Sequence, residues 1–158
     1  MSQHNLKGKT VLITGGAKNL GGLISRKFAE QGANLLIHYN SAATQSDAEE
    51  TLQAVQALGV KAILVQADLA NIQNIEDLFV QAKAEFGGVD IAINTVGRVL
   101  KKPYLDTTEQ EFDGMNDINN KIAYFFIQSA GRHLNPNGKI CTIVTSLLAA
   151  YTGLYSTY

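Results

Sequence analysis

Short apolar runs alternate along the chain with longer segments in which apolar residues recur every three or four positions. The apolar runs are rich in β-branched residues and lie between polar residues, glycine or proline, as buried strands do. They predict five strands, at 11–13, 34–39, 61–66, 90–94 and 139–145. The periodic segments predict four helices, at about 20–31, 47–58, 72–86 and 109–134. This alternation predicts a doubly wound α/β fold, in which helices cover both faces of a parallel sheet.

Local signals refine the ends of these elements. Ser46 with Glu49 and Thr108 with Glu111 have the spacing of capping boxes. The tripeptide Pro136-Asn137-Gly138 predicts a break before the fifth strand. The core side of the last helix is expected to include Phe112, Met115, Ile118, Ile122, Phe125 and Phe126.

A glycine-rich turn, Thr14-Gly15-Gly16-Ala17-Lys18-Asn19-Leu20-Gly21, follows the first strand and opens the first helix. Small residues let the backbone approach a ligand closely, and the free N–H groups at a helix start favour an anion. The spacing Thr-Gly-x-x-x-Asn-x-Gly differs from the Gly-x-Gly-x-x-Gly dinucleotide fingerprint. Asn19 tolerates a positive φ better than most residues. An ordinary tight turn in another α/β protein is the alternative interpretation.

Polar residues at the end of the second strand bear on the choice of ligand, because parallel sheets bind ligands beyond the carboxyl ends of their strands. A site selective for NAD usually offers a carboxylate there, and none occurs before Asp47. Lys18 in the turn is placed to reach a 2'-phosphate, with Asn40 and Ser41 as neutral hydrogen-bond donors. The sequence therefore favours NADP(H) over NAD(H), with a solvated loop lysine as the alternative.

The motifs in their order along the chain resemble the short-chain dehydrogenase/reductase family, including its 3-oxoacyl-(acyl carrier protein) reductases. The resemblance rests on the glycine turn, on Asn94-Thr95-Val96-Gly97, and on Ser146 twelve residues before Tyr158. It covers essentially the whole chain, although Asn19, Thr95 and Val96 depart from the family pattern. It implies a Rossmann-like fold. The cofactor-binding residues that it implies are Gly15, Lys18, Asn19, Leu20, Gly21, Asn40, Ser41, Asp68, Leu69, Asn94 and Gly97.

The resemblance also implies the catalytic residues. Ser146 would donate a hydrogen bond to a substrate carbonyl, Tyr158 would supply the proton as hydride reaches carbon, and Asn119 would hold a water in the proton path. A tyrosine with a pKa of about 10 needs a nearby cation to act as a base near neutral pH. The family places a lysine four residues after the tyrosine, and this sequence ends at Tyr158, preceded by Tyr151 and Tyr155.

Family members continue with another helix and two more strands. We therefore expect the sequence to be an incomplete product, truncated after the fifth strand. In that case the apolar strand within 140–144 lies near a sheet edge, where unpaired strands favour aggregation.

Composition bounds the remaining possibilities. A chain of 158 residues with 46% hydrophobic content suits one domain, at 1–158, and a net charge of -1 gives no electrostatic case for nucleic acid or a membrane surface. The polar N-terminus lacks a signal-peptide core, which makes a cytoplasmic protein the default. Cys141 is expected to be a small buried hydrophobe, and His4, His38 and His133 lack the spacing of metal ligands, so no metal site is expected.

These observations predict an NADP(H)-dependent oxidoreductase that acts on a small-molecule carbonyl or secondary alcohol. A non-catalytic dinucleotide-binding module or inactive fragment is the main alternative. A methyltransferase is a weaker one, because the acidic residue expected to hold its cofactor's ribose is missing from the end of the second strand. The apolar side of the helix at 109–134 and the resemblance together predict a homo-oligomer, a dimer or tetramer.

Overall fold

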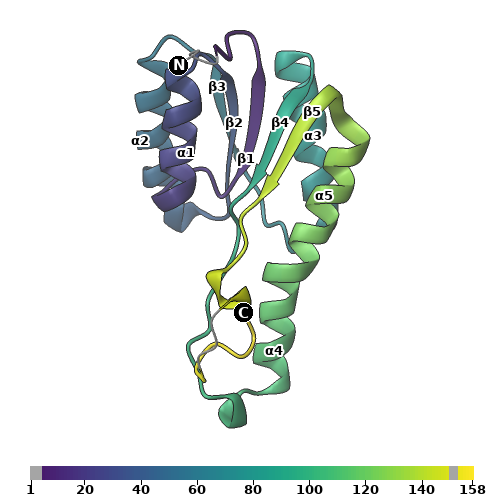
Figure 1. The fold of residues 1–158 in the computed structure, drawn as a ribbon. Helices are drawn as coiled ribbons and strands as arrows, with labels where there is room; N and C mark the ends of the chain where they lie inside the picture. Colours follow the sequence, from purple (N-terminus) through teal and green to yellow (C-terminus); the bar gives the residue numbers. More distant parts are fainter. Residues whose placement is uncertain (1–4, 150–152) are drawn as a thin grey trace.

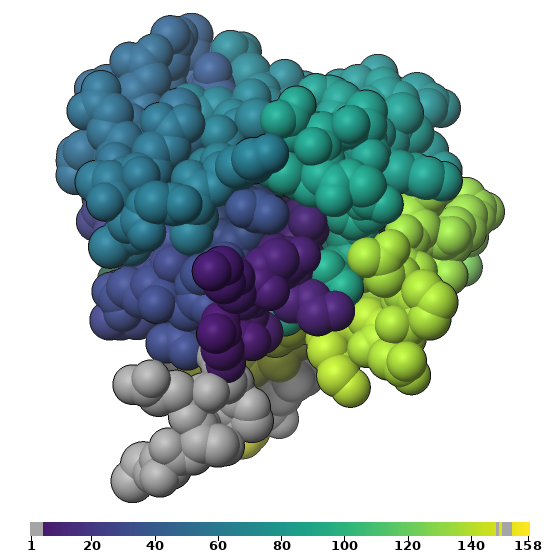
Figure 2. All heavy atoms as spheres, turned by 90° about the horizontal axis from the view of Figure 1, so that it is seen from above, coloured from purple at the N-terminus to yellow at the C-terminus, as the bar shows by residue number. Residues whose placement is uncertain are grey.

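The computed structural model describes residues 5–149 and 153–158. Five parallel strands form one sheet in the order β3-β2-β1-β4-β5. The strands are β1 (Thr10–Thr14), β2 (Asn34–Tyr39), β3 (Ala62–Gln66), β4 (Val89–Asn94) and β5 (Leu134–Thr142). Seen from above, the blue α2 and β3 region and the yellow-green β5 region lie on opposite flanks of the molecule (Figure 2), as this strand order requires. The predicted doubly wound, Rossmann-like α/β fold is confirmed.

Helices cover both faces of the sheet (Figure 1). One face carries α1 (Asn19–Glu30) and α2 (Gln45–Gln56), and the other carries α3 (Ile72–Phe86) and α5 (Ile122–His133). The short α4 (Glu109–Asn116) leads into α5 through one π-helical turn, Asp117–Lys121, so the predicted long helix exists with its regular hydrogen bonding interrupted.

Alternate residues of β1 belong to two separate cores, because successive side chains of a strand point to opposite faces. Leu12 packs in the cluster that contains Phe79 and Phe126 of α3 and α5. Val11 and Ile13 pack in the cluster beneath α1 and α2. The first strand is therefore buried on both faces, as its continuous apolar run predicts.

One of the two predicted capping boxes forms, because Thr108 and Glu111 cap α4. The other, Ser46 with Glu49, does not form: α2 begins at Gln45, with Thr44 as its N-cap and without a side-chain capping bond. A 3₁₀ turn, Ala42–Thr44, starts this segment early, so Ser46 falls inside the helix instead of capping it. Phe112, predicted to face the core, is 55% exposed.

The fifth strand departs most from expectation. It begins at Leu134 and ends at Thr142, and the predicted break at 136–138 is a bulge within the strand. Val89 pairs with Leu134 and Ile91 pairs with Lys139, so extra residues of β5 stand against Asp90.

The β5 strand also lies at the edge of the sheet, and in the described part of the chain β4 is its only partner strand. Cys141 is exposed there, which overturns the predicted burial of its side chain. Its apolar neighbours Ile140, Ile143 and Val144 are exposed as well. The predicted position of this strand near a sheet edge is confirmed.

Residues 153–158 return to the loop that follows β4. The Lys102 amide donates to the Leu154 carbonyl over 2.9 Å, and Lys102 forms an isolated bridge with Tyr155. The Lys102 ammonium contacts both carboxylate oxygens of Glu111 at 2.7 and 2.9 Å. This contact, with the capping bonds from Thr108, lowers the pKa of Glu111 to about 2. The start of α4 thereby holds the loop against which the residues before Tyr158 lie.

Core packing gives a direct test of this arrangement. Phe126 is fully buried, with its ring centroid 5.8 Å from that of Phe79, so Phe126→Ala leaves a cavity between α3 and α5. We expect it to lower the free energy of unfolding by about 3–5 kcal/mol, measured by urea denaturation. Tyr124→Ala is the matched control, because Tyr124 on the same helix is 64% exposed. Equal losses in the two variants would contradict the assigned burial.

Candidate functional site

The glycine turn between β1 and α1 has almost no free space inside it. A Cβ on Gly21 would stand 2.0 Å from the Gly15 carbonyl oxygen, so no larger residue fits without moving the turn. Gly15 has a φ of 69° and Asn19 a φ of 50°, so both adopt the left-handed region. Lys18 at the N-cap makes no side-chain capping bond, and the first turn of α1 carries no acidic residue. Such a helix start favours an anion.

The end of β4 braces this turn from the neighbouring strand. The Thr95 hydroxyl donates to the Thr14 carbonyl over 2.8 Å, and its oxygen lies 2.8 Å and 2.9 Å from where Cβ atoms on Gly15 and Gly21 would stand. The buried Asn94 side chain accepts from the Thr14 hydroxyl over 2.7 Å. The departure at Thr95 from the family pattern thus has a clear packing role.

His38 of β2 holds the same turn from the other side. Its Nδ1 accepts from the Gly15 amide over 3.1 Å, its carbonyl accepts from the Gly16 amide over 3.0 Å, and its Nε2 lies 2.8 Å from the Ala67 carbonyl. Burial lowers the pKa of His38, although the Ala67 carbonyl and the charge of Asp68 oppose this effect. The ring is therefore neutral at pH 7, with its proton on Nε2. Sequence analysis missed His38, although a lone polar residue within an apolar strand was a signal.

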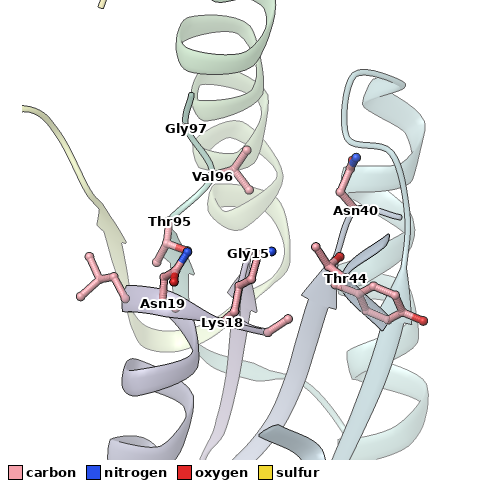
Figure 3. A pocket seen from close by; sticks show the side chains of 12 residues that line it. Gly15, Lys18, Asn19, Asn40, Thr44, Thr95, Val96 and Gly97 are labelled. Atoms are coloured by element: carbon pink, nitrogen blue, oxygen red, sulfur yellow. The ribbon is translucent and has the colours of Figure 1, made fainter. Parts of the chain in front are cut away.

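A first pocket of about 310 Å³ opens over the turn at the carboxyl ends of the strands. In Figure 3, Asn40 and Thr44 lie on one side and Thr95 and Val96 on the other, with the glycine turn between them. The Lys18 ammonium lies 3.3 Å from the Asp47 carboxylate, and both side chains are about half exposed. This pocket offers backbone, neutral polar groups and one cation, which suits a phosphorylated ligand.

The structure brings most of the predicted cofactor residues to this pocket and leaves a few outside it. The predicted residues that line it are Gly15, Lys18, Asn19, Leu20, Gly21, Asn40 and Gly97. Ser41, Asp68 and Leu69 line neither of the two pockets. The carbonyl of Ser41 accepts from the Thr44 amide, the exposed Asp68 accepts from the Ala70 amide, and Leu69 is buried in the core.

A second and larger pocket, of about 1030 Å³, adjoins the first and shares Val96 and Gly97 with it. Asn94 lines it, together with residues of α4, α5, the end of β5 and 156–158. A Cβ on Gly97 would lie 3.3 Å from Asn119 Oδ1 and 4.0 Å from Tyr158 Oη. The two polar side chains therefore flank one exposed stretch of backbone.

Asn119 lies in the π-helical turn before α5, and its side chain holds the loop after β4. Its Oδ1 accepts from the Arg98 amide and its Nδ2 donates to the Arg98 carbonyl, each over 2.9 Å. The sequence interpretation assigned Asn119 to a water, a role that stays a prediction. In the structure its amide group fixes the path of the backbone beside Gly97.

Only two of the three predicted catalytic residues line the second pocket. Asn119 and Tyr158 line the second pocket, whereas Ser146 starts a short 3₁₀ turn, Ser146–Leu148, and is not among the lining residues. Tyr158 is 41% exposed. Tyr151, another tyrosine of this region, lies outside the described residues, as does His4.

Two other features are absent from the described part of the chain. Within 5–149 and 153–158, no group of three His, Cys, Asp or Glu side chains is arranged to hold a metal ion. In the same part of the chain, no helix has both the length and the apolar character that crossing a bilayer requires.

Comparison with known proteins agrees with this geometry. Residues 15–158 match a family profile described as Enoyl-(Acyl carrier protein) reductase. The chain is 34% identical over 149 residues to hydroxynaphthalene reductase arp2 of Aspergillus fumigatus, covering 94% of this chain and 53% of that protein. It thus spans about half the length of that curated relative.

Solved structures with the same fold include two dehydrogenases that share more than half of their aligned residues with this chain. A candidate dehydrogenase from Burkholderia cenocepacia with bound NADP shares 56% identity and a TM-score of 0.94, over 98% of this chain and 59% of that one. A short-chain dehydrogenase from Oenococcus oeni shares 54% identity and a TM-score of 0.81, over 98% and 70% of the two chains. The chain therefore belongs to the short-chain dehydrogenase/reductase family of oxidoreductases.

Proposed function

We propose that this chain binds NADP(H) and that the protein transfers hydride between that cofactor and a carbonyl or secondary alcohol. The observation that carries the proposal is that the two pockets meet at Val96 and Gly97. One pocket lies over an anion-favouring helix start, and the other contains a tyrosine hydroxyl. A long ligand with phosphates at one end and a reactive ring at the other suits this continuous path.

The residues present fit such a cofactor. The Gly15 to Gly21 turn would hold its phosphates, because it leads into the uncapped start of α1, whose free N–H groups favour an anion. Gly97, exposed between the pockets, would let the cofactor lie against backbone. When bound, NADPH supplies the hydride.

The family's mechanism assigns the remaining steps to this chain's own side chains. Tyr158 would donate its hydroxyl proton to the substrate oxygen as that oxygen gains negative charge, and Ser146 would donate a hydrogen bond to the same oxygen. Asn119 would organise a water that returns the proton to Tyr158. The position of Tyr158 Oη beside Gly97 supports its part in this scheme.

The choice of NADP(H) over NAD(H) rests on charge. Lys18 and Asp47 form an ion pair at the edge of the first pocket, where Asn40 and Thr44 are neutral. A 2'-phosphate would give Lys18 a second anionic partner, and charge-assisted contacts to phosphate are stronger than neutral hydrogen bonds. The NADP bound to the Burkholderia cenocepacia relative supports the same choice.

Binding without turnover is the second candidate function. It is favoured by the exposure of Ser146 outside the second pocket. Cofactor affinity without any carbonyl reduction would select it.

Glycine substitution tests cofactor binding. Gly21→Ala should weaken NADPH binding about tenfold or more, because the new methyl group would displace the turn. Fluorescence titration with NADPH measures this affinity. Gly131→Ala is the control, since a Cβ at that helical position meets nothing within 4 Å. Unchanged affinity in Gly21→Ala would show that the turn is not the cofactor site.

Charge substitution tests cofactor choice. Lys18→Ala should weaken NADPH binding about tenfold and leave NADH binding within about threefold, because only NADPH carries the 2'-phosphate. Lys27→Ala is the matched control, because Lys27 pairs with Glu30 at the far end of α1. Parallel losses of both cofactors in Lys18→Ala would remove the argument for NADP(H).

Tyrosine substitution tests turnover. Tyr158→Phe should lower NADPH-dependent reduction of a carbonyl substrate by about 10²-fold or more, because it removes the proton donor, while NADPH affinity stays the same. Absorbance at the nicotinamide band follows the reaction. Tyr104→Phe, at an exposed position before α4, should react at the rate of the unsubstituted protein. Retained activity in Tyr158→Phe would overturn its assigned role.

A further inference from the structure

His38 connects the two parts of the nucleotide site that the sequence places far apart. It is 1% exposed and lies at the end of β2, between the glycine turn after β1 and the end of β3. On one side the turn's Gly15 and Gly16 amides donate to it, the first to Nδ1 and the second to its carbonyl. On the other side its Nε2 contacts the Ala67 carbonyl, one residue before Asp68.

A neutral imidazole suits this position because it presents an acceptor and a donor at opposite ends of one rigid ring. Gly15 has a positive φ, so the turn needs contacts that hold it in this conformation. An aliphatic side chain could fill the space, but it would leave the Gly15 amide without the acceptor that Nδ1 provides.

We propose that His38 is a positioning residue for the cofactor, which holds the glycine turn in its binding conformation through the Gly15 amide. The inference rests on the proposed function, because it presupposes that the turn binds NADP(H). His38 itself is buried under the turn and does not line the first pocket. Its effect on affinity therefore passes through the backbone of Gly15 and Gly16.

Protonation would reverse the contact. A proton on Nδ1 would set one N–H donor against another at Gly15, and the turn would have to move. The neighbouring elements present Gly15 and Gly16 from the β1 side and Ala67 from the β3 side, and none of these residues has a titratable side chain. Asp68 is the titratable group of the described residues whose charge acts on His38, and it favours the protonated ring.

Three substitutions at one position separate positioning from space filling. His38→Asn keeps an acceptor for the Gly15 amide, because its Oδ1 stands as many bonds from Cα as Nδ1 does. His38→Gln carries its amide one bond farther out, at the position of Nε2, and His38→Phe keeps volume without a donor or an acceptor. At pH 7.5, we expect NADPH affinity within about threefold of the unsubstituted protein for Asn and about tenfold weaker for Phe and Gln. His133→Gln, on α5, is the control and should bind normally.

The outcomes are distinguishable. Failure of the unsubstituted protein to bind NADPH overturns the proposed function. Normal binding by the folded Phe variant, or by the Gln variant if Phe does not fold, overturns the role of His38 alone. Equal weakening in all three variants also overturns it, because rescue by Asn is the mark of the hydrogen bond from the Gly15 amide.

A pH profile gives an independent readout. Because the pKa of His38 in the folded protein lies below its ordinary value of 6.5, the unfolded chain binds the proton first as the pH falls. The stability contributed by the neutral ring is therefore complete above pH 6.5 and declines below it. Urea unfolding from pH 7.5 to 5.5 should show this decline in the unsubstituted protein, and less of it in His38→Asn. Identical profiles in the two proteins would contradict the burial of a neutral ring.

Discussion

The close approach of Gly21 to the Gly15 carbonyl is the constraint on which the rest of the site depends. With 2.0 Å between that oxygen and any added Cβ, the chain passes from β1 into α1 only through a turn without side chains at these points. This passage aims the start of α1 at the end of the sheet, where a helix's free N–H groups attract an anion. It also leaves the turn without side chains at Gly15, Gly16 and Gly21, and neighbouring strands contribute contacts that hold it.

Both neighbouring strands do so through polar side chains that contact backbone. Thr95 at the end of β4 bonds the Thr14 carbonyl, and His38 of β2 accepts from the Gly15 amide. Because β1 lies between these two strands, the turn is held from both sides. The position of Thr95 explains how the chain departs from the family motif without losing the turn: its hydroxyl occupies the space beside two glycines.

Sequence patterns were sufficient for the sheet, because each strand is a compact apolar run and each turn has a local signal. They failed for features that depend on contacts between residues far apart in the sequence. The bulge in β5 depends on its register against β4, and the exposure of Cys141 depends on the edge position of that strand, neither of which is local information. The glycine turn and Asn119 could be located from spacing, whereas the contact of His38 with Gly15 joins residues 23 apart and needed the structure.

Backbone and side chains have different roles at this site. Asn119 uses both ends of its amide on the backbone of Arg98. Thr95 uses its hydroxyl on the Thr14 carbonyl, and His38 uses Nδ1 on the Gly15 amide. Polar side chains therefore fix the loops, and backbone at Gly15, Gly21 and Gly97 is left among the groups that line the first pocket. Backbone recognises a ligand by its shape and its phosphates. Discrimination between ligands then falls to the side chains that line the pockets, with Lys18 in the first and Tyr158 in the second.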